Sequence, residues 1–384
     1  MADSLKTFFS PALIRRLAGE LVRAHPSFPS AAFVAAATKG LQRFELLDRG
    51  RHIARAMALH LPHEYPDAIA VLLGSLGPEH ASDELIGVGM APFFYLPHTL
   101  FVAEHGLDHF DLSMRAQSEL TKRFSAESSV RPFIAKDPER ALAWFDRWSG
   151  DANAHVRRLV SEGTRLRLPW APRVAWLDEH PDCVLRLLDR LKDDPASLVR
   201  RSVANNLNDL GKVHPSLLFE TCRSWLHDAT LERRALVEHA LRSAVKRGEP
   251  DALRLLGYGG AASVSIARAR VTPRRVPIGG RVSIELLIRS RARTAQQLLV
   301  DLAVHFVKAN GRTSPKVFKL KRLTLPPRGE AALTTSVSLA IHTTRTPRPG
   351  RHSVEVVVNG QSLPCGSFYV CAPLRKSTPI SRRG

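Results

Sequence analysis

A short polar run near the middle of the chain has a spacing that places charged groups side by side. Arginine and glutamate follow His155 at intervals of three, seven and ten residues, as Arg158, Glu162 and Arg165. In an α-helix these positions share one face, and Asp151 stands where an N-cap would. A carboxylate fixed beside guanidinium groups can stabilise a developing positive charge. The alternative, a solvated face with an ordinary i,i+4 Arg–Glu pair, stays open on this pattern alone.

A later segment repeats the arrangement. Its polar residues fall on one side of the expected helix, opposite a stripe of valines and leucines. The polar residues are Arg201, Asn205, Asn208 and Asp209. Stacked structural repeats place equivalent faces next to one another on a concave surface. Two such faces predict a rim of arginines around carboxylates.

The elements that carry these faces read as an internal repeat. DANAHVRRLVSEGTR aligns with DPASLVRRSVANNLN at an offset of 43 residues, so the VRR triplet at 156–158 matches that at 199–201. A fainter third copy, HDATLERRALVEHALRS, follows after 33 residues and puts Arg233 and Arg234 at the paired arginines. Helix pairs repeating with such periods are typical of HEAT-like stacking.

Two further residues stand out by their context. Glu127 is a lone acid between Arg123 and Arg131 in KRFSAESSVRPF, and Trp170 follows a proline in the short loop RLPWAP. An indole beside carboxylates can stack on a base, a sugar or a cationic group. The alternatives are core packing for Trp170 and a plain helix salt bridge for Glu127.

The usual catalytic signatures are missing from the sequence. It contains no P-loop, no GxGxxG, no GxSxG and no HExxH, and its four cysteines show no zinc-site spacing. We therefore expect any catalysis to rest on carboxylates, with no cofactor and no metal.

Hydrophobic periodicity divides the chain into two domains. Apolar residues recur every three or four positions over residues 1–256, which predicts an all-α HEAT-like repeat solenoid. Alternating runs over residues 262–373, among them RVSIELLIR and HSVEVVVNG, predict about seven strands of an all-β immunoglobulin-like sandwich. We expect residues 374–384 to be a disordered basic tail.

Charge is distributed very unevenly between the two predicted domains. Residues 1–260 hold 34 basic and 32 acidic residues, a net of +2, whereas residues 261–384 hold 22 against 4, a net of +18. This asymmetry predicts a polyanionic partner that the sandwich grips. The phosphate-binding candidates there are Arg289, Arg291, Lys319 and Lys321. No apolar run is long enough for a signal peptide or a membrane span, so we expect a cytoplasmic, nucleoid-associated monomer with no membrane partner.

Three segments, LTKRFSAESSVRPFI, DANAHVRRLVSEGTRLRLPWA and LVRRSVANNLNDLGK, resemble the bacterial alkylpurine DNA glycosylases of the AlkC and AlkD kind, and the AlkC branch most. The resemblance spans about residues 1–256, and some AlkC members also carry a C-terminal immunoglobulin-like domain. It implies that the repeats hold damaged double-stranded DNA and that the lesion is cleaved without base flipping.

The resemblance also implies roles for individual residues. Those expected around the target deoxyribose are Glu127, Glu162, Trp170 and Asp209. Those expected to bind the DNA backbone and orient the acids are Arg158, Arg165, Arg201 and Asn205. One departure is that Ser128 and Ser129 follow Glu127, where similar sequences have a bulky apolar or aromatic residue.

The chemistry suits these residue types. A base such as 3-methylcytosine, 3-methyladenine or 1-methyladenine is already cationic and leaves without a general acid, so the protein has only to stabilise an oxocarbenium-like sugar and position water. The sequence thus predicts a DNA N-glycosylase of base excision repair. The alternatives are a non-catalytic HEAT-repeat scaffold that binds DNA or protein and a protein attached to a membrane surface.

Overall fold

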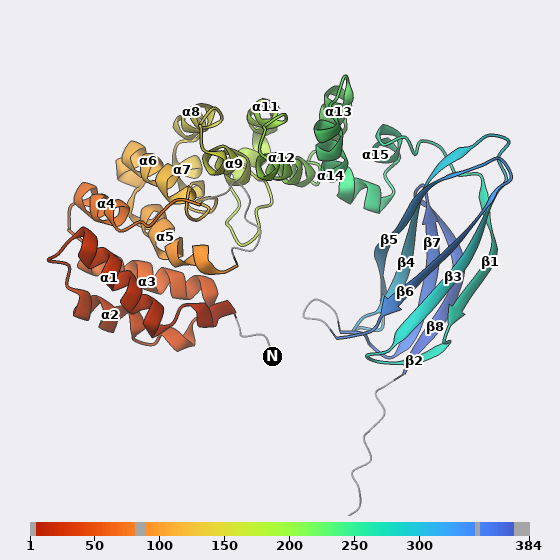
Figure 1. Ribbon diagram of the computed structural model, residues 1–384, viewed down its shortest axis with the longest axis horizontal. Helices are drawn as coiled ribbons and strands as arrows, with labels where there is room; N and C mark the ends of the chain where they lie inside the picture. The colour runs from red at the N-terminus through yellow and green to blue at the C-terminus, as the bar shows by residue number, and fades with distance from the viewer. Residues whose placement is uncertain (1–4, 81–88, 342–345, 372–384) are drawn as a thin grey trace, which may run out of the picture. The chain divides into compact units, whose positions relative to one another are not determined.

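The computed structural model describes residues 5–80, 89–341 and 346–371. The chain separates into two compact units, Met1–Ala240 and Leu241–Gly384. Helices occupy the first unit, and the second holds the end of α14, α15 and all the strands (Figure 1). The expected order, a helical repeat domain followed by a β-sandwich, is confirmed.

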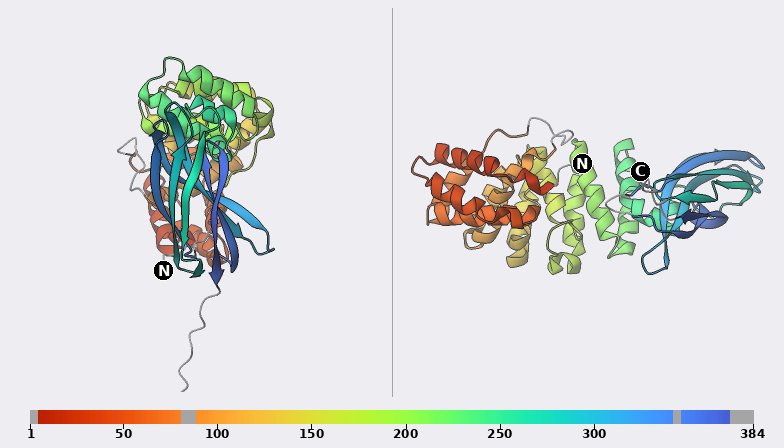
Figure 2. Two further views of the ribbon diagram at one scale, coloured as in Figure 1. Left: turned by 90° about the vertical axis from the view of Figure 1, so that its right-hand side faces the viewer. Right: turned by 90° about the horizontal axis from the view of Figure 1, so that it is seen from below.

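The helices of the described residues are η1 Leu5–Phe8, α1 Pro11–Ala24, α2 Ser30–Thr38, η2 Leu41–Arg43, α3 Leu46–His60, α4 Tyr65–Gly74, η3 Ala91–Tyr95, α5 Leu96–His105, η4 Leu107–His109, α6 Phe110–Thr121, α7 Arg131–Lys136, α8 Pro138–Trp148, α9 Ala154–Gly163, α10 Ala175–Glu179, α11 Pro181–Leu191, α12 Ser197–Leu210, α13 Pro215–Leu226, α14 Leu231–Arg247 and α15 Pro250–Leu255. Those of the first unit stack one after another along the chain (Figure 2). No helix in the described part of the chain combines the length and apolarity needed to cross a membrane.

Packing of α9 against α12 builds the central repeat. Each helix buries a stripe of fully enclosed apolar side chains, Val156, Leu159 and Val160 from α9 and Val199, Val203 and Leu207 from α12. A buried amide adds direction to this contact, because Asn206 Nδ2 donates to Ser161 O at 2.8 Å and to Thr164 Oγ1 at 3.0 Å. The remaining faces of the two helices are polar and adjacent, as the repeat predicts.

The start of α9 differs from the expectation by two residues. Asn153, not Asp151, is the N-cap, and its side chain accepts a hydrogen bond from His155 N at 2.9 Å. Asp151 instead accepts from Asn153 N at 2.8 Å, one step before the helix. The predicted cap was wrong because an Asx turn precedes the cap, and either residue type can fill either role.

Eight strands, counted over the described residues, form two sheets. They are β1 Val264–Thr272, β2 Arg275–Pro277, β3 Arg281–Ser290, β4 Gln296–Val307, β5 Thr313–Leu325, β6 Glu330–Ser338, β7 Gly350–Val358 and β8 Gln361–Cys371. One sheet has the order β1-β3-β6 and the other β2-β8-β7-β4-β5. Alternation along β3 buries Val282, Ile284, Leu286 and Ile288, which confirms the face expected for RVSIELLIR. These side chains join the core of the sandwich.

Candidate active site

Five side chains from three segments form a continuous chain of alternating acids and arginines, which we call the carboxylate–arginine chain. Arg158 Nη2 lies 3.3 Å from Glu127 Oε2 and 3.5 Å from Glu162 Oε1. Arg165 Nη1 lies 2.9 Å from Glu162 Oε2, and its Nη2 lies 2.8 Å from Asp209 Oδ2. The acids come from the segment between α6 and α7, from α9 and from α12, so their meeting depends on how the repeats stack.

The middle of this chain is buried. Glu162 and Asp209 are 4% and 1% exposed. Arg165 Nε also donates to Asp209 Oδ2 at 2.8 Å, and Lys212 Nζ donates to Oδ1 at 2.7 Å. Burial opposes the positive charge of Arg165, but Glu162 and Asp209 outweigh it and hold the pKa of the guanidinium above its usual value. Each buried carboxylate thus has a cationic partner within hydrogen-bond distance, as a buried acid requires.

Arg131 connects the end of α9 to the loop that follows it through hydrogen bonds to backbone oxygens. It is 1% exposed, and its guanidinium donates to Pro172 O at 2.7 Å, Gly163 O at 2.9 Å and Arg165 O at 3.0 Å. Burial lowers the pKa of Arg131 to about 10. The guanidinium thus joins the end of α9 to the loop that carries Trp170, a role that no sequence pattern indicated.

Trp170 is displayed to solvent, not packed in the core. Its side chain is 69% exposed, and its φ is +63°, a left-handed conformation that costs a residue with a Cβ about 1 kcal/mol. It lines a cavity of about 440 Å³ together with Glu127 and Arg158, and with the rings of Phe93 and Phe124. The core alternative for Trp170 is therefore wrong, and the strained backbone is consistent with a functional position.

Ser128 and Ser129 line the same cavity. Ser129 is buried, and its hydroxyl donates to Gln117 Oε1 at 2.8 Å, so it belongs to the scaffold. At the position of the departure noted in the sequence, the cavity next to Glu127 is thus lined by two small hydroxyl side chains.

Matching contacts at three helix starts define which residues of the repeats are equivalent. Arg157 donates to Ala152 O at 3.0 Å, and Arg200 donates to Pro195 O at 2.8 Å. Arg234 donates to Ala229 O at 3.2 Å, and all three arginines are the fourth residue of their helix. Arg234 therefore corresponds to Arg200, so the third copy is offset by 34 residues. The alignment by 33 was wrong by one residue, because the double arginine made both offsets look alike.

The corrected offset gives equivalent positions on the polar faces of the repeats: Glu162, Asn205 and His239. His239 Nε2 lies 3.0 Å from Asn205 Oδ1. Arg201 is the equivalent of Arg158, but an amide replaces the carboxylate beside it, and in the described residues Arg201 forms no ion pair. His239 was missed by the sequence reasoning, and a correct third copy would have identified it.

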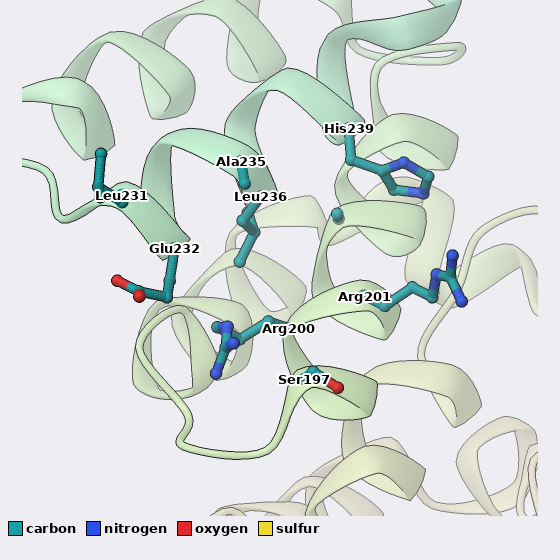
Figure 3. Close-up of a pocket in the computed structure, with 9 residues that line it drawn as sticks. Ser197, Arg200, Arg201, Leu231, Glu232, Ala235, Leu236 and His239 are labelled. Atoms are coloured by element: carbon teal, nitrogen blue, oxygen red, sulfur yellow. The ribbon is translucent and has the colours of Figure 1, made fainter. Parts of the chain in front are cut away.

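Arg201 and His239 line one shallow groove of about 430 Å³ between α12 and α14. Figure 3 shows both side chains on the same side of the groove, whereas Arg200 and Glu232 lie on the other. Hydrogen bonds from its own backbone and from Thr230 lower the pKa of Glu232, and the charge of Arg200 adds to this effect. In the described residues neither arginine forms an ion pair, but the Arg200 guanidinium is engaged by the backbone oxygens of Asp194 and Pro195, which leaves Arg201 as the cation of the groove that is available to a ligand.

The four cations predicted for the sandwich do not make one patch. Arg289 lies on β3 and Arg291 just after it, next to the three-stranded sheet, whereas Lys319 and Lys321 lie on β5, the edge strand of the other sheet. Arg289 Nη2 pairs with Glu330 Oε1 at 2.6 Å, and all four side chains are exposed. Their separation into two sheets follows from strand order, which the sequence alone does not reveal.

Comparisons with known proteins agree with this architecture. Residues 265–372 match the family model of the YhaZ C-terminal immunoglobulin-like domain. The uncharacterized protein YhaZ of Bacillus subtilis is 32% identical over 376 residues, covering 97% of this chain and all of YhaZ. The alkylpurine DNA glycosylase AlkC of Pseudomonas fluorescens, solved bound to DNA containing an abasic site analog, superposes with a TM-score of 0.89 at 34% identity. That match covers 96% of this chain and 100% of the AlkC chain.

Proposed function

Since this chain belongs to the family of Bacillus subtilis YhaZ and Pseudomonas fluorescens AlkC, we propose that it is a DNA N-glycosylase that excises cationic alkylated bases from duplex DNA. The proposed substrates are 3-methylcytosine, 3-methyladenine and 1-methyladenine. The observation that carries the proposal is the carboxylate–arginine chain, whose exposed end, Glu127 with Arg158, shares a cavity with Trp170.

The proposed chemistry uses these groups in two steps, cleavage of the glycosidic bond and addition of water. As the glycosidic bond breaks, its electron pair goes to the cationic base, which leaves neutral, and positive charge develops on the sugar. Glu127 is the acid best placed to stabilise that charge, because Ser125 Oγ donates to its Oε2 at 2.6 Å while the side chain stays 26% exposed. Water then adds to the sugar, and a carboxylate takes up its proton. The exposed indole of Trp170 adds cation–π attraction.

The buried acids Glu162 and Asp209 add negative electrostatic potential to that of Glu127. Arg165 holds Glu162 and Asp209 in fixed positions, so their charges need no rearrangement during the reaction. We assign Asp209 as the second acid of the reaction, reached when DNA displaces Lys212 from Oδ1. Of the three carboxylates only Glu127 lines the cavity, which favours a lesion that stays in the duplex over one flipped into the cavity.

The polar faces of the later repeats are assigned to the DNA backbone. Arg201 is an exposed cation without an ion pair in the described residues, and Asn205 and His239 lie beside it. Guanidinium and imidazole groups are common phosphate ligands. Arg158 and Arg165 are engaged with carboxylates, so we assign them to orienting the acids. In the sandwich we keep Arg289, Arg291, Lys319 and Lys321 as phosphate contacts from two separate surfaces.

Release of free base from methylated duplex DNA tests this function. The full-length protein should release methylated adenine or cytosine, separated from DNA by chromatography, and should leave uracil and hypoxanthine in place because no general acid is available for a neutral base. A scaffold would bind the same DNA and release nothing. Excision of uracil would contradict the proposed mechanism, since it requires a protonated leaving group.

A further inference from the structure

A second groove lies in the β-sandwich, where the two sheets meet along β1 and β8. Its volume is about 600 Å³. β1 is the outer strand of its sheet, and β2 pairs only with residues 369–371 of β8, so most of the β8 edge is open. Gly366 permits the close approach of the strands, because a Cβ there would lie 2.9 Å from Val271 Cγ2, and its φ is +144°. Val271 and the buried ring of Phe368 contribute to the lining.

The groove is strongly basic. Arg270, Arg274 and Arg351 line it, and no acidic residue is among its described lining residues. Glu285 lies opposite Arg270 in the β1–β3 register, yet none of the three arginines forms an ion pair in the part of the chain that the structure describes. Arg351 Nε only donates to Ser367 Oγ at 3.3 Å. Three uncompensated guanidinium groups along one groove favour an anionic ligand with several charges.

The groove is also lined by an exposed aromatic ring, that of Tyr369. Tyr369 is 43% exposed and lines the groove. Its backbone N donates to Arg274 O at 2.8 Å, which fixes the residue next to β2. The guanidinium carbon of Arg275 lies 5.2 Å from the ring centroid, a cation–π contact that orients the ring. A fixed, exposed ring among arginines is the arrangement on which bases stack while phosphates meet the cations.

We propose that this groove binds a single-stranded segment of nucleic acid, with phosphates on Arg270, Arg274 and Arg351 and a base on Tyr369. In a duplex the faces of the bases are covered by their neighbours, so only an unpaired strand can place a base on the ring. The four cations assigned above to duplex phosphates lie outside this groove. The site is therefore separate from the excision chemistry and does not depend on it.

Edge strands also carry charged side chains merely to prevent association of sheets, so the experiment has to separate recognition from charge. Binding of a labelled thymidine oligonucleotide of about twelve nucleotides, within the usual site size, is measured on the full-length protein in excess unlabelled duplex. Tyr369→Ser should weaken binding by about 5-fold or more, the equivalent of one lost stacked base. Tyr369→Phe keeps the ring and should bind within about twofold of wild type.

Charge is tested with two matched triple variants. Replacing Arg270, Arg274 and Arg351 by Gln should reduce the log–log salt slope by about 2, or about 0.7 for each phosphate contact of a single strand. The control replaces three exposed arginines outside the groove by Gln; they are Arg281, Arg312 and Arg328. It should keep the wild-type slope, and every variant should keep the wild-type melting temperature and rate of base excision.

Four results would overturn the proposal: equal binding by Tyr369→Ser and Tyr369→Phe, equal slopes for the two triple variants, displacement of the oligonucleotide by the duplex, or displacement by polyglutamate as effective as by a second oligonucleotide. The last result would identify an acidic peptide surface instead. A protein that excises no base but binds the oligonucleotide as described would contradict the proposed function and leave this site intact.

Discussion

Replacing Arg165 with methionine should destabilise the helical unit severely. The substitution removes the group that holds Glu162 at 2.9 Å and Asp209 at 2.8 Å, and both acids are almost fully buried. Removing one partner of a buried ion pair costs about 3–5 kcal/mol, because the remaining charge is uncompensated. Lys212 still contacts Asp209 at 2.7 Å, so we expect the lower end, about 3 kcal/mol.

The free energy of unfolding is measured by urea denaturation followed by tryptophan fluorescence. All five tryptophans lie between positions 144 and 225, so the signal reports the helical unit alone. The control is Arg186→Met, which breaks an exposed pair with Asp146 of 3.3 Å and should cost at most about 0.5 kcal/mol.

Removing the acids together with Arg165 distinguishes charge from lost packing. Arg165→Met combined with Glu162→Gln and Asp209→Asn should recover most of the lost stability, since no charge is then left uncompensated. A single variant as stable as Arg186→Met would refute the claim that the buried acids depend on Arg165.

Three other predictions concern Trp170, His98 and the sandwich. Trp170→Gly should slow base release by about tenfold through the lost cation–π contact, yet should not lower the melting temperature, because glycine relieves the positive φ of +63°. Burial lowers the pKa of His98 from 6.5 to about 3, so below about pH 6.5 the unfolded chain binds a proton that the folded protein does not. The free energy of unfolding should therefore decrease by up to about 1.4 kcal/mol for each pH unit below that value. Denaturation at several pH values measures this decrease, which should be smaller in His98→Leu. Replacing Lys319 and Lys321 by Gln should reduce the salt slope of duplex binding by about 1.8 if both meet phosphates, whereas an unchanged slope would remove them from the interface.

Local periodicity is sufficient to predict the fold class and part of the site. The contact of Arg158 with Glu162 follows from helix geometry and can be expected from residue order alone. Arg165 was expected on the same helix face but lies two residues beyond the end of α9, and it still reaches Glu162 at 2.9 Å. The link from Arg165 to Asp209 cannot be expected from residue order, because it spans 44 residues and depends on the packing of α9 against α12. Burial of the acids likewise follows from that packing and not from residue type.

The errors have equally local causes. Two Asx-type residues before α9 left the cap ambiguous, and the double arginine near the start of α14 concealed a shift of one residue that hid His239. The sandwich cations were grouped by sequence charge, but strand order decides which strands are neighbours. Arg270, Arg274 and Tyr369 come together only because β1 and β8 lie at adjoining edges of different sheets.

The central claim is that Glu127, the carboxylate at the exposed end of the carboxylate–arginine chain, acts in catalysis. Glu127→Gln keeps the size of the side chain and its contact with Ser125. Glu139→Gln is the matched control, since Glu139 is exposed in the first turn of α8. The measurement is the single-turnover rate of base release from methylated duplex, with DNA affinity determined on the same samples. Glu127→Gln should lower the rate by about 10²–10³ with little change in affinity, as for other lost electrostatic groups, and the control should match wild type. A rate for Glu127→Gln within about twofold of wild type would contradict the account.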